Sequence, residues 1–335
     1  MNVAVIGASG YTGLELVKIL IAHPNFKITY IANSEGGVSL SDLHPSLKDV
    51  VELDVKMANA KEVAKVAGVA FLALPHKTSM SFAKELLLLG IKVVDLSADY
   101  RLELDTYEKH YCAHEDKGHI EEAVYGLPEF YSEKIKKSKL VANPGCYPTA
   151  TLLGLMPFVD FIERDSQVFI DAKSGVSGAG KKLSEITQYV TVNENIFAYN
   201  PMVHRHGPEI KEKVQKIKGK DLNINFVPHL LALTRGMLVS IYVTLKNDDM
   251  DPIEVLEKYY EKNEFVRIRK EPVNVKNTAG TNFCDIYAKA NGKGLFISSS
   301  IDNLLRGASS QAVVNANLMC GFRSDEGISK IAYVP

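Results

Sequence analysis

A glycine-rich turn near the start of the chain constrains the fold more than any other feature of the sequence. An apolar run at residues 2–6 is typical of a buried parallel strand, and residues 12–22 place Leu, Val and Ile at helical spacing. The turn between them reads Gly7-Ala8-Ser9-Gly10-Tyr11-Thr12-Gly13. Glycines here let the backbone approach a pyrophosphate, which N–H groups at the start of the next helix can bind. We predict a dinucleotide-binding turn; the alternative is a tight turn in an unrelated α/β protein.

Strand-like and helical segments alternate over the first 142 residues. Apolar runs near 27–32, 69–74, 92–96 and 139–142 have the length of buried strands, and residues 78–89 have helical spacing. This alternation predicts an α/β fold with a parallel sheet covered by helices on both faces, a Rossmann-type dinucleotide-binding domain.

The pattern changes in the second half of the chain. Strand-like segments at 166–173, 222–232, 237–246 and 294–301 are interrupted by helical patterns at 207–218 and 252–262. This mixture predicts a second, mixed α/β domain. The tail at 306–322 is helical and apolar on one side, so we expect it to return to the first domain. The predicted domains are residues 1–146 with 306–335, and residues 147–305.

The end of the second predicted strand bears on the choice of cofactor. NAD enzymes place an acid there to bind the ribose 2′-hydroxyl. This chain has Asn33 and Ser34 at that place, with Glu35 one residue later and no Lys or Arg adjacent. The missing acid favours NADP, with Ser34 as a candidate contact.

Cys146 is the strongest candidate for a reactive residue. It stands in Asn143-Pro144-Gly145-Cys146-Tyr147-Pro148-Thr149, between a short strand and an apolar helical stretch. A helix N-terminus stabilises a thiolate and so lowers the thiol pKa, which predicts a nucleophile. A buried structural cysteine is the alternative, and it suits the other three better: Cys112, Cys284 and Cys320. Their wide spacing argues against a zinc site or a disulfide framework and fits a reducing compartment.

Two histidines flank an arginine at His204-Arg205-His206, just before a predicted helix. Histidine is the commonest general acid–base near neutral pH, so we predict a catalytic or substrate role for at least one of them. The spacing does not distinguish His204 from His206. A solvated surface loop is the alternative, and a metal site lacks further ligands nearby.

Three further features are candidates for binding the substrate's anionic groups. The segment Ser174–Gly180 follows a predicted strand, and its small residues, among them Ser174, Gly175 and Ser177, could cradle a phosphate. A flexible linker is the alternative there. Arg235 stands in an apolar surround, and Arg101, which follows the segment Asp95–Tyr100, is a similar candidate. For either arginine, an anionic ligand or an internal salt bridge would be an explanation.

Charge and hydropathy exclude several classes of function. The net charge of −1 provides no basic footprint for nucleic acid or for an anionic membrane. No run approaches the roughly 20 apolar residues of a membrane span. The chain also starts without the basic segment and cleavage site of a signal peptide. We expect a cytoplasmic protein.

Taken together and in this order, the motifs resemble those of the N-acetyl-γ-glutamyl-phosphate reductases, an NADPH-dependent family of arginine biosynthesis. The resemblance spans nearly the whole chain. Besides the glycine turn, the Cys146 segment and the Ser174–Gly180 segment, it rests on Leu96–Arg101, Tyr125–Glu129, His204–Ile210 and Gly307–Asn315.

The resemblance implies both a reaction and roles for residues. N-acetyl-L-glutamyl 5-phosphate would be reduced to N-acetyl-L-glutamate 5-semialdehyde and phosphate through a thioester on Cys146. A histidine of the His204–His206 pair would transfer protons, and Asn315 would lie near the nicotinamide of NADPH. The second domain would be catalytic and dimerising, in homodimers or homotetramers. Many relatives carry an arginine after the second strand, where this chain has Asn33 and Ser34.

Three alternatives are retained. A carrier-linked aminoadipyl-phosphate reductase of lysine biosynthesis would share the chemistry and differ in its substrate. An aspartyl-phosphate semialdehyde dehydrogenase would share the fold but fits the Cys146 and His204–His206 segments poorly. A non-catalytic NADP sensor would have no need of an activated thiol.

Overall fold

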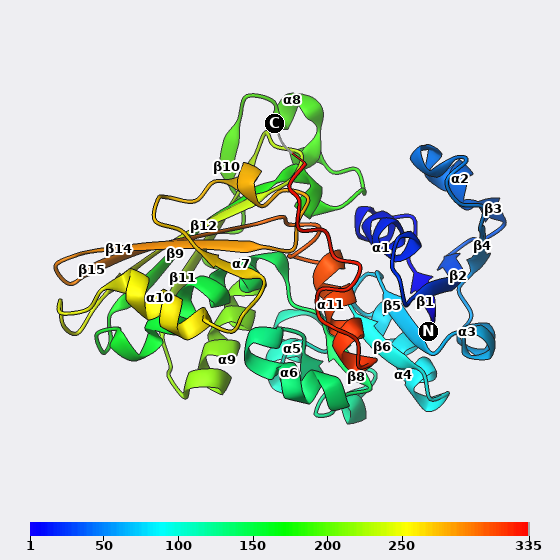
Figure 1. Ribbon diagram of the computed structural model, residues 1–335, viewed down its shortest axis with the longest axis horizontal. Coiled ribbons are helices and arrows are strands. Elements are labelled where there is room, and N and C mark those ends of the chain that lie inside the picture. The colour runs from blue at the N-terminus through cyan, green and yellow to red at the C-terminus, as the bar shows by residue number, and fades with distance from the viewer. Residues whose placement is uncertain (334–335) are drawn as a thin grey trace. The chain divides into compact units, whose positions relative to one another are not determined.

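The computed structural model describes residues 1–333; residues 334 and 335, which belong to the predicted first domain, lie outside the described residues. Packing divides the chain into two units (Figure 1). The first comprises Met1–Pro144 with Ala308–Ile328, and the second Gly145–Gly307 with the chain from Ser329 on. The units differ from the predicted domains at their borders. Cys146 opens a helix on the sheet of the second unit, and the Tyr333 N–H donates to the Ala279 carbonyl (3.3 Å).

The first unit is built on an eight-stranded sheet of residues within the described range. Its strands are β1 (Asn2–Ile6), β2 (Lys27–Asn33), β3 (Val38–Ser39), β4 (Asp54–Met57), β5 (Val69–Leu72), β6 (Lys92–Asp95), β7 (Val124–Tyr125) and β8 (Leu140–Ala142). The order is β3-β4-β2-β1-β5-β6-β8-β7, and every adjacent pair is parallel except β3 and β4. β1 lies inside the sheet, and its residues from Val3 to Ile6 are buried, as the apolar run predicts.

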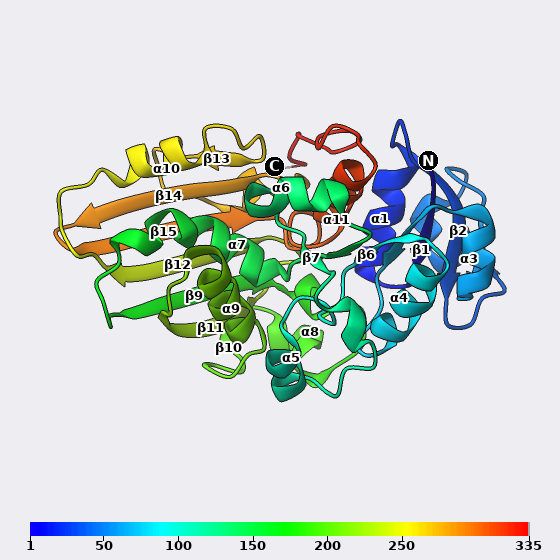
Figure 2. The ribbon, with the colours of Figure 1, turned by 90° about the horizontal axis from the view of Figure 1, so that it is seen from below.

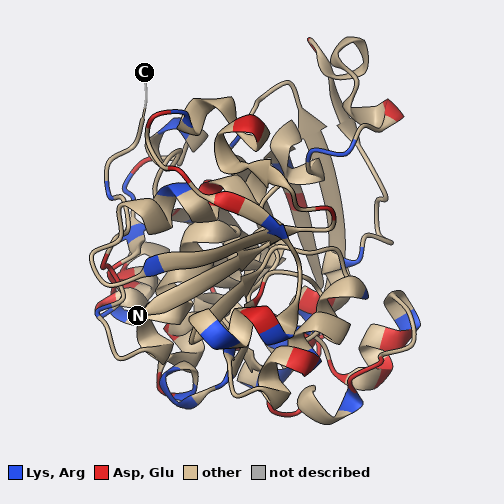
Figure 3. Ribbon diagram, turned by 90° about the vertical axis from the view of Figure 1, so that its right-hand side faces the viewer, with Lys and Arg blue, Asp and Glu red and all other residues tan. Residues whose placement is uncertain are grey.

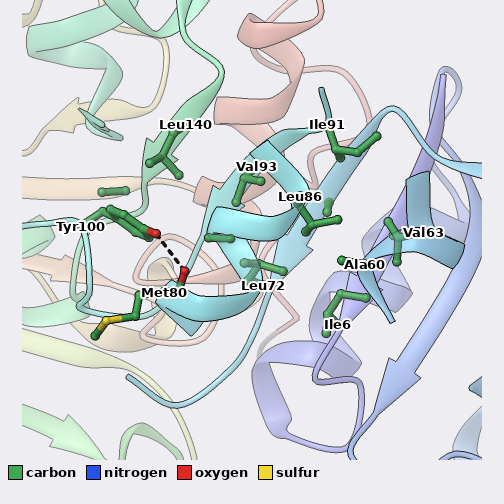
Figure 4. Packing of buried hydrophobic residues seen from close by; sticks show 14 of the residues in the cluster. Ile6, Ala60, Val63, Leu72, Met80, Leu86, Ile91, Val93, Tyr100 and Leu140 are labelled. Atoms are coloured by element: carbon green, nitrogen blue, oxygen red, sulfur yellow. Dashed lines mark hydrogen bonds between the residues drawn. The ribbon is translucent and has the colours of Figure 1, made fainter. Parts of the chain in front are cut away.

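Helices pack on this sheet and complete its core. They are α1 (Tyr11–Ile21), α2 (Leu40–Leu43), α3 (Ala60–Val66), α4 (Thr78–Leu88), α5 (Leu104–His110), α6 (Pro128–Lys137) and α11 (Ser309–Met319). Figure 4 shows Met80 and Leu86 of α4 packed with Leu72 and Val93 of the strands, and all four side chains are fully buried. Burial of such side chains contributes roughly 1.5–3 kcal/mol each.

α11 corrects one expectation. The sequence predicts a tail helix that is apolar on one side, but every residue of α11 is buried. The helix packs against α1, α6 and β6, so it lies between other elements of the first unit. Its polar side chains, such as Gln311 and Asn315, are hydrogen-bonded inside the unit. This internal pairing makes a fully buried polar side chain tolerable.

The second unit is built on a seven-stranded mixed sheet of described residues. Its strands are β9 (Gln167–Gly175), β10 (Ile196–Ala198), β11 (Asn223–Leu231), β12 (Met237–Thr244), β13 (Val266–Ile268), β14 (Cys284–Asn291) and β15 (Gly294–Ile301). The order is β10-β11-β9-β12-β15-β14-β13, with β11–β9 and β13–β14 parallel and the other pairs antiparallel. The sequence analysis missed β14, because its polar and charged residues obscure the alternation of apolar and polar residues that marks a strand.

Helices cover one face of this sheet (Figures 1 and 2). They are α7 (Cys146–Leu155), α9 (His206–Lys218) and α10 (Pro252–Tyr260); the short α8 (Tyr189–Val192) lies in the connection before β10. α7 packs on β12 and β15, and each of its residues from Tyr147 to Leu155 is buried. The opposite face carries exposed aromatic side chains, among them Phe169 and Tyr242. These face each other in the β9–β12 register.

Acidic and basic residues are intermixed along the ribbon in Figure 3. No helix within residues 1–333 combines the length and the apolar character that a bilayer crossing needs. The same residues contain no group of three or more His, Cys, Asp or Glu side chains arranged to hold a metal ion. The two-domain α/β architecture agrees with the predicted fold class.

Candidate active site

Cys146 stands at the N-terminus of a buried helix. α7 begins at this residue, and Gly145 occupies the N-cap position without a side-chain cap or an acid in the first turn. The helix end therefore directs the partial positive charge of its dipole toward the thiol, which favours a thiolate. Cys146 is partly exposed, whereas its neighbours on both sides are buried. Cys146 is thus a partly exposed residue in a buried segment.

Space around Cys146 is limited by a glycine from a distant part of the chain. A Cβ atom at Gly307 would lie 2.6 Å from the Cβ of Cys146 and 2.5 Å from the carbonyl oxygen of Asn303. Both approaches are shorter than van der Waals contact, so a side chain at position 307 would displace the backbone or the cysteine. Gly307 belongs to a motif that the sequence analysis named, but its contact with Cys146 appears only in the structure.

Glu209 ties the cysteine turn to the helix that follows the histidines. Its Oε1 accepts the backbone N–H of Gly145 at 3.0 Å, and the side chain is almost fully buried. Since Glu209 lies in the first turn of α9, this bond holds the N-termini of α7 and α9 together. The sequence analysis did not single out Glu209. Its place three residues after His206, in the first turn of a helix, was the available signal.

The two histidines lie next to each other and beside Tyr147, the residue after Cys146. The ring centroids of His204 and His206 are 5.9 and 5.8 Å from that of Tyr147, and 4.8 Å from each other. The structure therefore places both predicted histidines beside the N-terminus of α7. They are not solvated side chains of a surface loop, which was the alternative.

Burial gives His204 a defined protonation state. Desolvation, assisted by the charge of Arg205, lowers the pKa of His204 to about 4. Its Nδ1 accepts the backbone N–H of His206 at 3.1 Å, so the neutral ring carries its proton on Nε2. His204 is consequently neutral near pH 7 and braces the turn that leads into α9.

Two tyrosines complete this cluster, and the sequence analysis named neither as a site residue. The Tyr147 hydroxyl donates to the carbonyl of His229 (3.2 Å). The Tyr199 hydroxyl in turn donates to the hydroxyl of Tyr147 (3.2 Å). Burial raises the pKa of Tyr199 to about 12 and raises the pKa of Tyr147 further. Both phenols therefore stay protonated at neutral pH.

The predicted phosphate cradle is an ordered segment, not a flexible linker. Ser174 and Gly175 end β9, and Ser177 lies in a 3₁₀ turn (Val176–Ala179). The N–H groups of Gly175, Val176 and Ser177 donate to carbonyls of residues 233–236 at 2.8–3.1 Å. These three N–H groups are therefore not available to a phosphate, whereas a phosphate contact by the rest of the segment stays a prediction. The Ser177 hydroxyl accepts a hydrogen bond from Asn303 Nδ2 (3.0 Å).

The arginines lie in different units and make internal bonds. Arg235 forms a two-point ion pair with the buried Asp302, with Nε–Oδ2 at 3.0 Å and Nη2–Oδ1 at 3.3 Å. Arg101, in the first unit, donates to the carbonyls of Asn143 (2.7 Å) and Leu96 (2.8 Å). For Arg235 these contacts match the internal salt bridge that was kept as the alternative. Substrate contact by either guanidinium stays a prediction.

In the first unit, the glycine turn has the geometry that a pyrophosphate needs. Gly7 has φ +93°, and a Cβ there would lie 2.2 Å from the Ala73 carbonyl oxygen. A Cβ at Gly13 would lie 2.4 Å from the Gly7 carbonyl oxygen. α1 then begins at Tyr11, with no side-chain cap from Gly10 and no acid in its first turn. The residues of Gly7–Gly13, including Ser9 and Thr12, thus fit an anion at a helix N-terminus.

The end of β2 presents no carboxylate. Asn33 uses its side-chain oxygen within its own turn, accepting the N–H groups of Glu35 (2.9 Å) and Gly36 (2.6 Å). Ser34 is exposed beside it. A contact between the Ser34 hydroxyl and a 2′-phosphate stays a prediction.

Asn315 is buried and acts as a bridge. Its Nδ2 donates to the Gly126 carbonyl (2.9 Å) and to Asn143 Oδ1 (3.0 Å). Asn143 in turn donates to the Ala308 carbonyl (3.0 Å). Asn315 therefore supports the segment three residues before Cys146. A contact between Asn315 and a nicotinamide stays a prediction.

Comparison with known proteins gives matches over both units. The family described as "Semialdehyde dehydrogenase, NAD binding domain" matches residues 2–138, and "Semialdehyde dehydrogenase, dimerisation domain" matches residues 146–303. The chain is 62% identical to N-acetyl-gamma-glutamyl-phosphate reductase of Sulfurovum sp. over the full length of both chains. The protein of the same name from Sulfurimonas denitrificans is 56% identical, over 100% of this chain and 99% of that one. The one from Methanococcus maripaludis strain C6 is 42% identical, over 98% of each chain.

Solved structures of similar fold are more distant in sequence. Aspartate semialdehyde dehydrogenase II of Vibrio cholerae, complexed with ASA, has a TM-score of 0.72 at 17% identity, covering 96% of this chain and 98% of that chain. The aspartate semialdehyde dehydrogenase of Candida albicans with NADP has a TM-score of 0.72 at 14% identity, covering 95% and 98%. At this identity the similarity establishes the fold alone.

Proposed function

The chain belongs to the N-acetyl-γ-glutamyl-phosphate reductase family, and on that premise we propose that it reduces N-acetyl-L-glutamyl 5-phosphate to N-acetyl-L-glutamate 5-semialdehyde and phosphate with NADPH, in arginine biosynthesis. One observation carries the proposal. Cys146 opens a buried helix beside two histidines, in a chain that matches relatives of this name from end to end.

The first half-reaction uses the thiolate of Cys146. The sulfur attacks the acyl carbon and a C–S bond forms. The bond between the acyl carbon and the bridging oxygen breaks, and phosphate leaves with the electron pair. A thioester to Cys146 results. The carbonyl oxygen becomes anionic during attack, and N–H groups at the start of α7 are the donors that can stabilise it.

NADPH, when bound, supplies the hydride that reduces the thioester carbon. The chain must then release the aldehyde from Cys146. Reduction of the thioester leaves an oxyanion on the carbon bound to Cys146, and an acid protonates it to a hydroxyl group. The same residue, now a base, takes that proton back as the C=O bond re-forms, the C–S bond breaks and the sulfur leaves as a thiolate. Phenols that stay protonated, as Tyr147 and Tyr199 do, are poor bases for this step.

We assign the proton transfer to His206. His204 has its Nδ1 committed to the turn, and its lowered pKa makes it a weak base near neutral pH. His206 opens α9, which Glu209 holds against the cysteine turn. These observations support His206 as the acid–base and His204 as its neutral brace.

NADPH would be held by the first unit. The N–H groups at the start of α1 would bind the pyrophosphate, with Gly7, Gly10 and Gly13 leaving room for the close approach. The Ser34 hydroxyl would face the ribose 2′-phosphate. The match to an NAD-binding family over residues 2–138 supports this placement.

We further propose that the protein acts as a homodimer or homotetramer through the second unit. The match to a dimerisation domain over residues 146–303 supports this, as does the sheet face that carries Phe169 and Tyr242 exposed. Such an exposed aromatic face is typical of an interface. The cytoplasm, a reducing compartment, suits an enzyme with a free nucleophilic thiol.

The carrier-linked aminoadipyl substrate has less support. The relatives that match from end to end are named for the N-acetylglutamyl phosphate. The aspartate semialdehyde dehydrogenases share only the fold at 13–17% identity. A non-catalytic NADP sensor would not need Cys146 at a helix N-terminus beside two histidines.

The reverse reaction tests the assignment directly. Purified protein is mixed with N-acetylglutamate semialdehyde, phosphate and NADP⁺, and the absorbance of the reduced cofactor is followed. We expect phosphate-dependent reduction of NADP⁺, with aspartate semialdehyde as a much poorer substrate. Equal or better turnover of aspartate semialdehyde, or no phosphate dependence, would contradict the proposal.

A further inference from the structure

Two buried aspartates in the first unit take no part in the chemistry described above. Asp95 ends β6, and Asp99 follows four residues later; both side chains are fully buried. Their partners differ. Asp95 accepts the hydroxyls of Ser79 (2.5 Å) and Ser97 (2.7 Å). Asp99 accepts mainly backbone N–H groups, which lie at the start of α4.

Asp99 caps α4 from outside the helix. Its carboxylate accepts the N–H of Lys77, the N-cap residue, at 2.9 and 3.0 Å, and the N–H of Met80 at 2.8 Å. The Tyr107 hydroxyl donates a further bond at 2.6 Å. A carboxylate at this place satisfies two N–H groups at the end of the helix and interacts favourably with its dipole. Next to it, the Tyr100 hydroxyl donates to the Met80 carbonyl at 3.1 Å (Figure 4).

Lys77 is held in a strained conformation. Its backbone has φ +72° and ψ −49°, a γ-turn geometry that is rare for a residue with a side chain. Such a conformation costs on the order of 1–3 kcal/mol and persists only where surrounding bonds impose it. The two bonds between the Lys77 N–H and Asp99 are of that kind.

The strained residue ends a loop that begins against the dinucleotide-binding turn. This loop, residues 73–77, follows β5, the parallel neighbour of β1. The Ala73 N–H donates to the Ile6 carbonyl at 2.8 Å, and the Ala73 carbonyl is the atom that a Cβ on Gly7 would strike. Its last residues, His76 and Lys77, are exposed. The carboxyl ends of adjacent parallel strands are where dinucleotides bind such sheets.

We propose that Asp99 is a positioning residue for the cofactor, because it fixes the loop of residues 73–77 in its strained form beside Gly7. This inference rests on the proposed NADPH dependence. Asp99 acts through backbone N–H groups and contacts no reacting atom. Its loss should weaken NADPH binding and leave the chemical step at saturating cofactor largely intact.

Asp95 provides a matched control. It is as deeply buried as Asp99 and belongs to the same segment, but apart from the Ser97 N–H (3.1 Å) it binds side-chain hydroxyls, not the 73–77 loop. Asp95→Asn and Asp99→Asn therefore remove the same charge from the same core. Only Asp99→Asn weakens a direct hold on the loop. The Lys77 and Met80 N–H groups both lie on Oδ2 of Asp99, and a neutral amide oxygen there accepts them more weakly than a carboxylate and carries no charge for the helix dipole.

The experiment measures NADPH affinity by cofactor fluorescence, without acyl phosphate, and then steady-state rates. We expect Asp99→Asn to lower NADPH affinity about tenfold or more. KM for NADPH should rise in parallel, with kcat and KM for the acyl phosphate changed less than threefold. Asp95→Asn should stay within twofold of wild type. Wild-type NADPH affinity in Asp99→Asn, or an equal loss in Asp95→Asn, overturns the proposal.

Lys77 variants test the same link from the other side and serve if Asp99→Asn does not fold. Lys77→Pro cannot adopt a positive φ and has no N–H for Asp99, while a proline at a helix start leaves α4 intact. We expect it to lose NADPH affinity as Asp99→Asn does, and Lys77→Ala to keep it. An equal loss in Lys77→Ala would assign the effect to the ammonium group and refute a role through the backbone. If wild-type protein binds NADPH but reduces no acyl phosphate, the proposed function fails while this test remains valid.

Discussion

The backbone N–H of Gly145 donates to Oε1 of Glu209 at 3.0 Å, across 64 residues of sequence. This bond joins the residue before the cysteine to the first turn of α9, which begins at His206. Cys146 and His206, the proposed nucleophile and acid–base, thus depend on one buried carboxylate for their relative placement within the second unit.

Substitution of Glu209 should therefore affect both stability and rate. Glu209→Ala leaves the buried Gly145 N–H without its acceptor, and the loss of such a partner costs about 1–3 kcal/mol in the free energy of unfolding. We expect kcat to fall at least tenfold, whereas Glu209→Gln, which retains an oxygen acceptor, should lose less on both counts. Urea unfolding and steady-state rates measure this. Identical values for the Ala and Gln variants would show that the bond does not position the cysteine turn.

Cys146→Ser should abolish turnover and leave NADPH binding nearly intact. A serine hydroxyl at the start of α7 is far less ionised than a thiol, so the covalent step fails while the first unit is untouched. Steady-state assays and NADPH fluorescence measure the two effects. Cys284→Ser, at a fully buried cysteine, is the control and should retain activity. More than a few per cent of wild-type rate in Cys146→Ser would refute the thioester route.

The two histidines should separate in their pH dependence. Removal of a general acid–base typically costs 10²–10⁴ in rate, which we expect for His206→Asn at every pH between 6 and 9. His204 has its pKa lowered to about 4 and is neutral over that range. His204→Asn should therefore lower the rate less and leave the shape of the pH–rate profile unchanged. A profile that His204→Asn alters and His206→Asn does not would reverse the assignment.

Ser34 should influence the choice between NADPH and NADH. An aspartate at the end of β2 would repel the 2′-phosphate and could bind a 2′-hydroxyl instead. We expect Ser34→Asp to shift the ratio of kcat/KM values at least tenfold toward NADH, and Ser34→Ala to weaken NADPH use modestly. Rates with both cofactors measure the shift. An unchanged preference in Ser34→Asp would place the 2′-phosphate elsewhere.

Asp95 should make the protein less stable as the pH rises from 4 to 6. Burial, reinforced by the charge of Asp99, raises the pKa of Asp95 to about 6, above the value near 3.8 of an exposed aspartate. Between these values the folded state retains a proton that the unfolded state has released. Its stabilising effect is present below pH 4 and is lost as the pH rises through 6, at about 1.4 kcal/mol per pKa unit.

Asp95→Asn isolates this contribution, because an amide does not titrate. The free energy of unfolding of Asp95→Asn relative to wild type should increase between pH 4.5 and pH 7.5 in urea titrations. Any loss of packing energy caused by the asparagine is the same at both pH values, so it cancels in that comparison. The opposite pH dependence of stability that His204 contributes is present in both proteins and cancels as well. A difference that does not change with pH would mean that Asp95 titrates near its ordinary pKa.

The sequence alone was sufficient for the fold class, the family and the type of cofactor. The signals for these are local. A glycine turn between strand and helix must bend in a particular way whatever surrounds it, and the alternation of apolar runs with helical spacing determines a parallel sheet. The segments around Cys146 and His204–His206 are likewise contiguous, so their chemistry could be proposed before their surroundings were known.

Only the tertiary structure decided which groups surround the cysteine and in which protonation state. Glu209, Tyr199 and Gly307 reach the start of α7 from distant segments, and no local pattern indicates that they meet there. Within the predicted cradle at Ser174–Gly180, the N–H groups of residues 175–177 are not available for the same reason, since carbonyl groups of residues 233–236 accept them. Burial, which lowers the pKa of His204 and raises that of Asp95, is a property of packing between segments, so it appears only when the chain has folded.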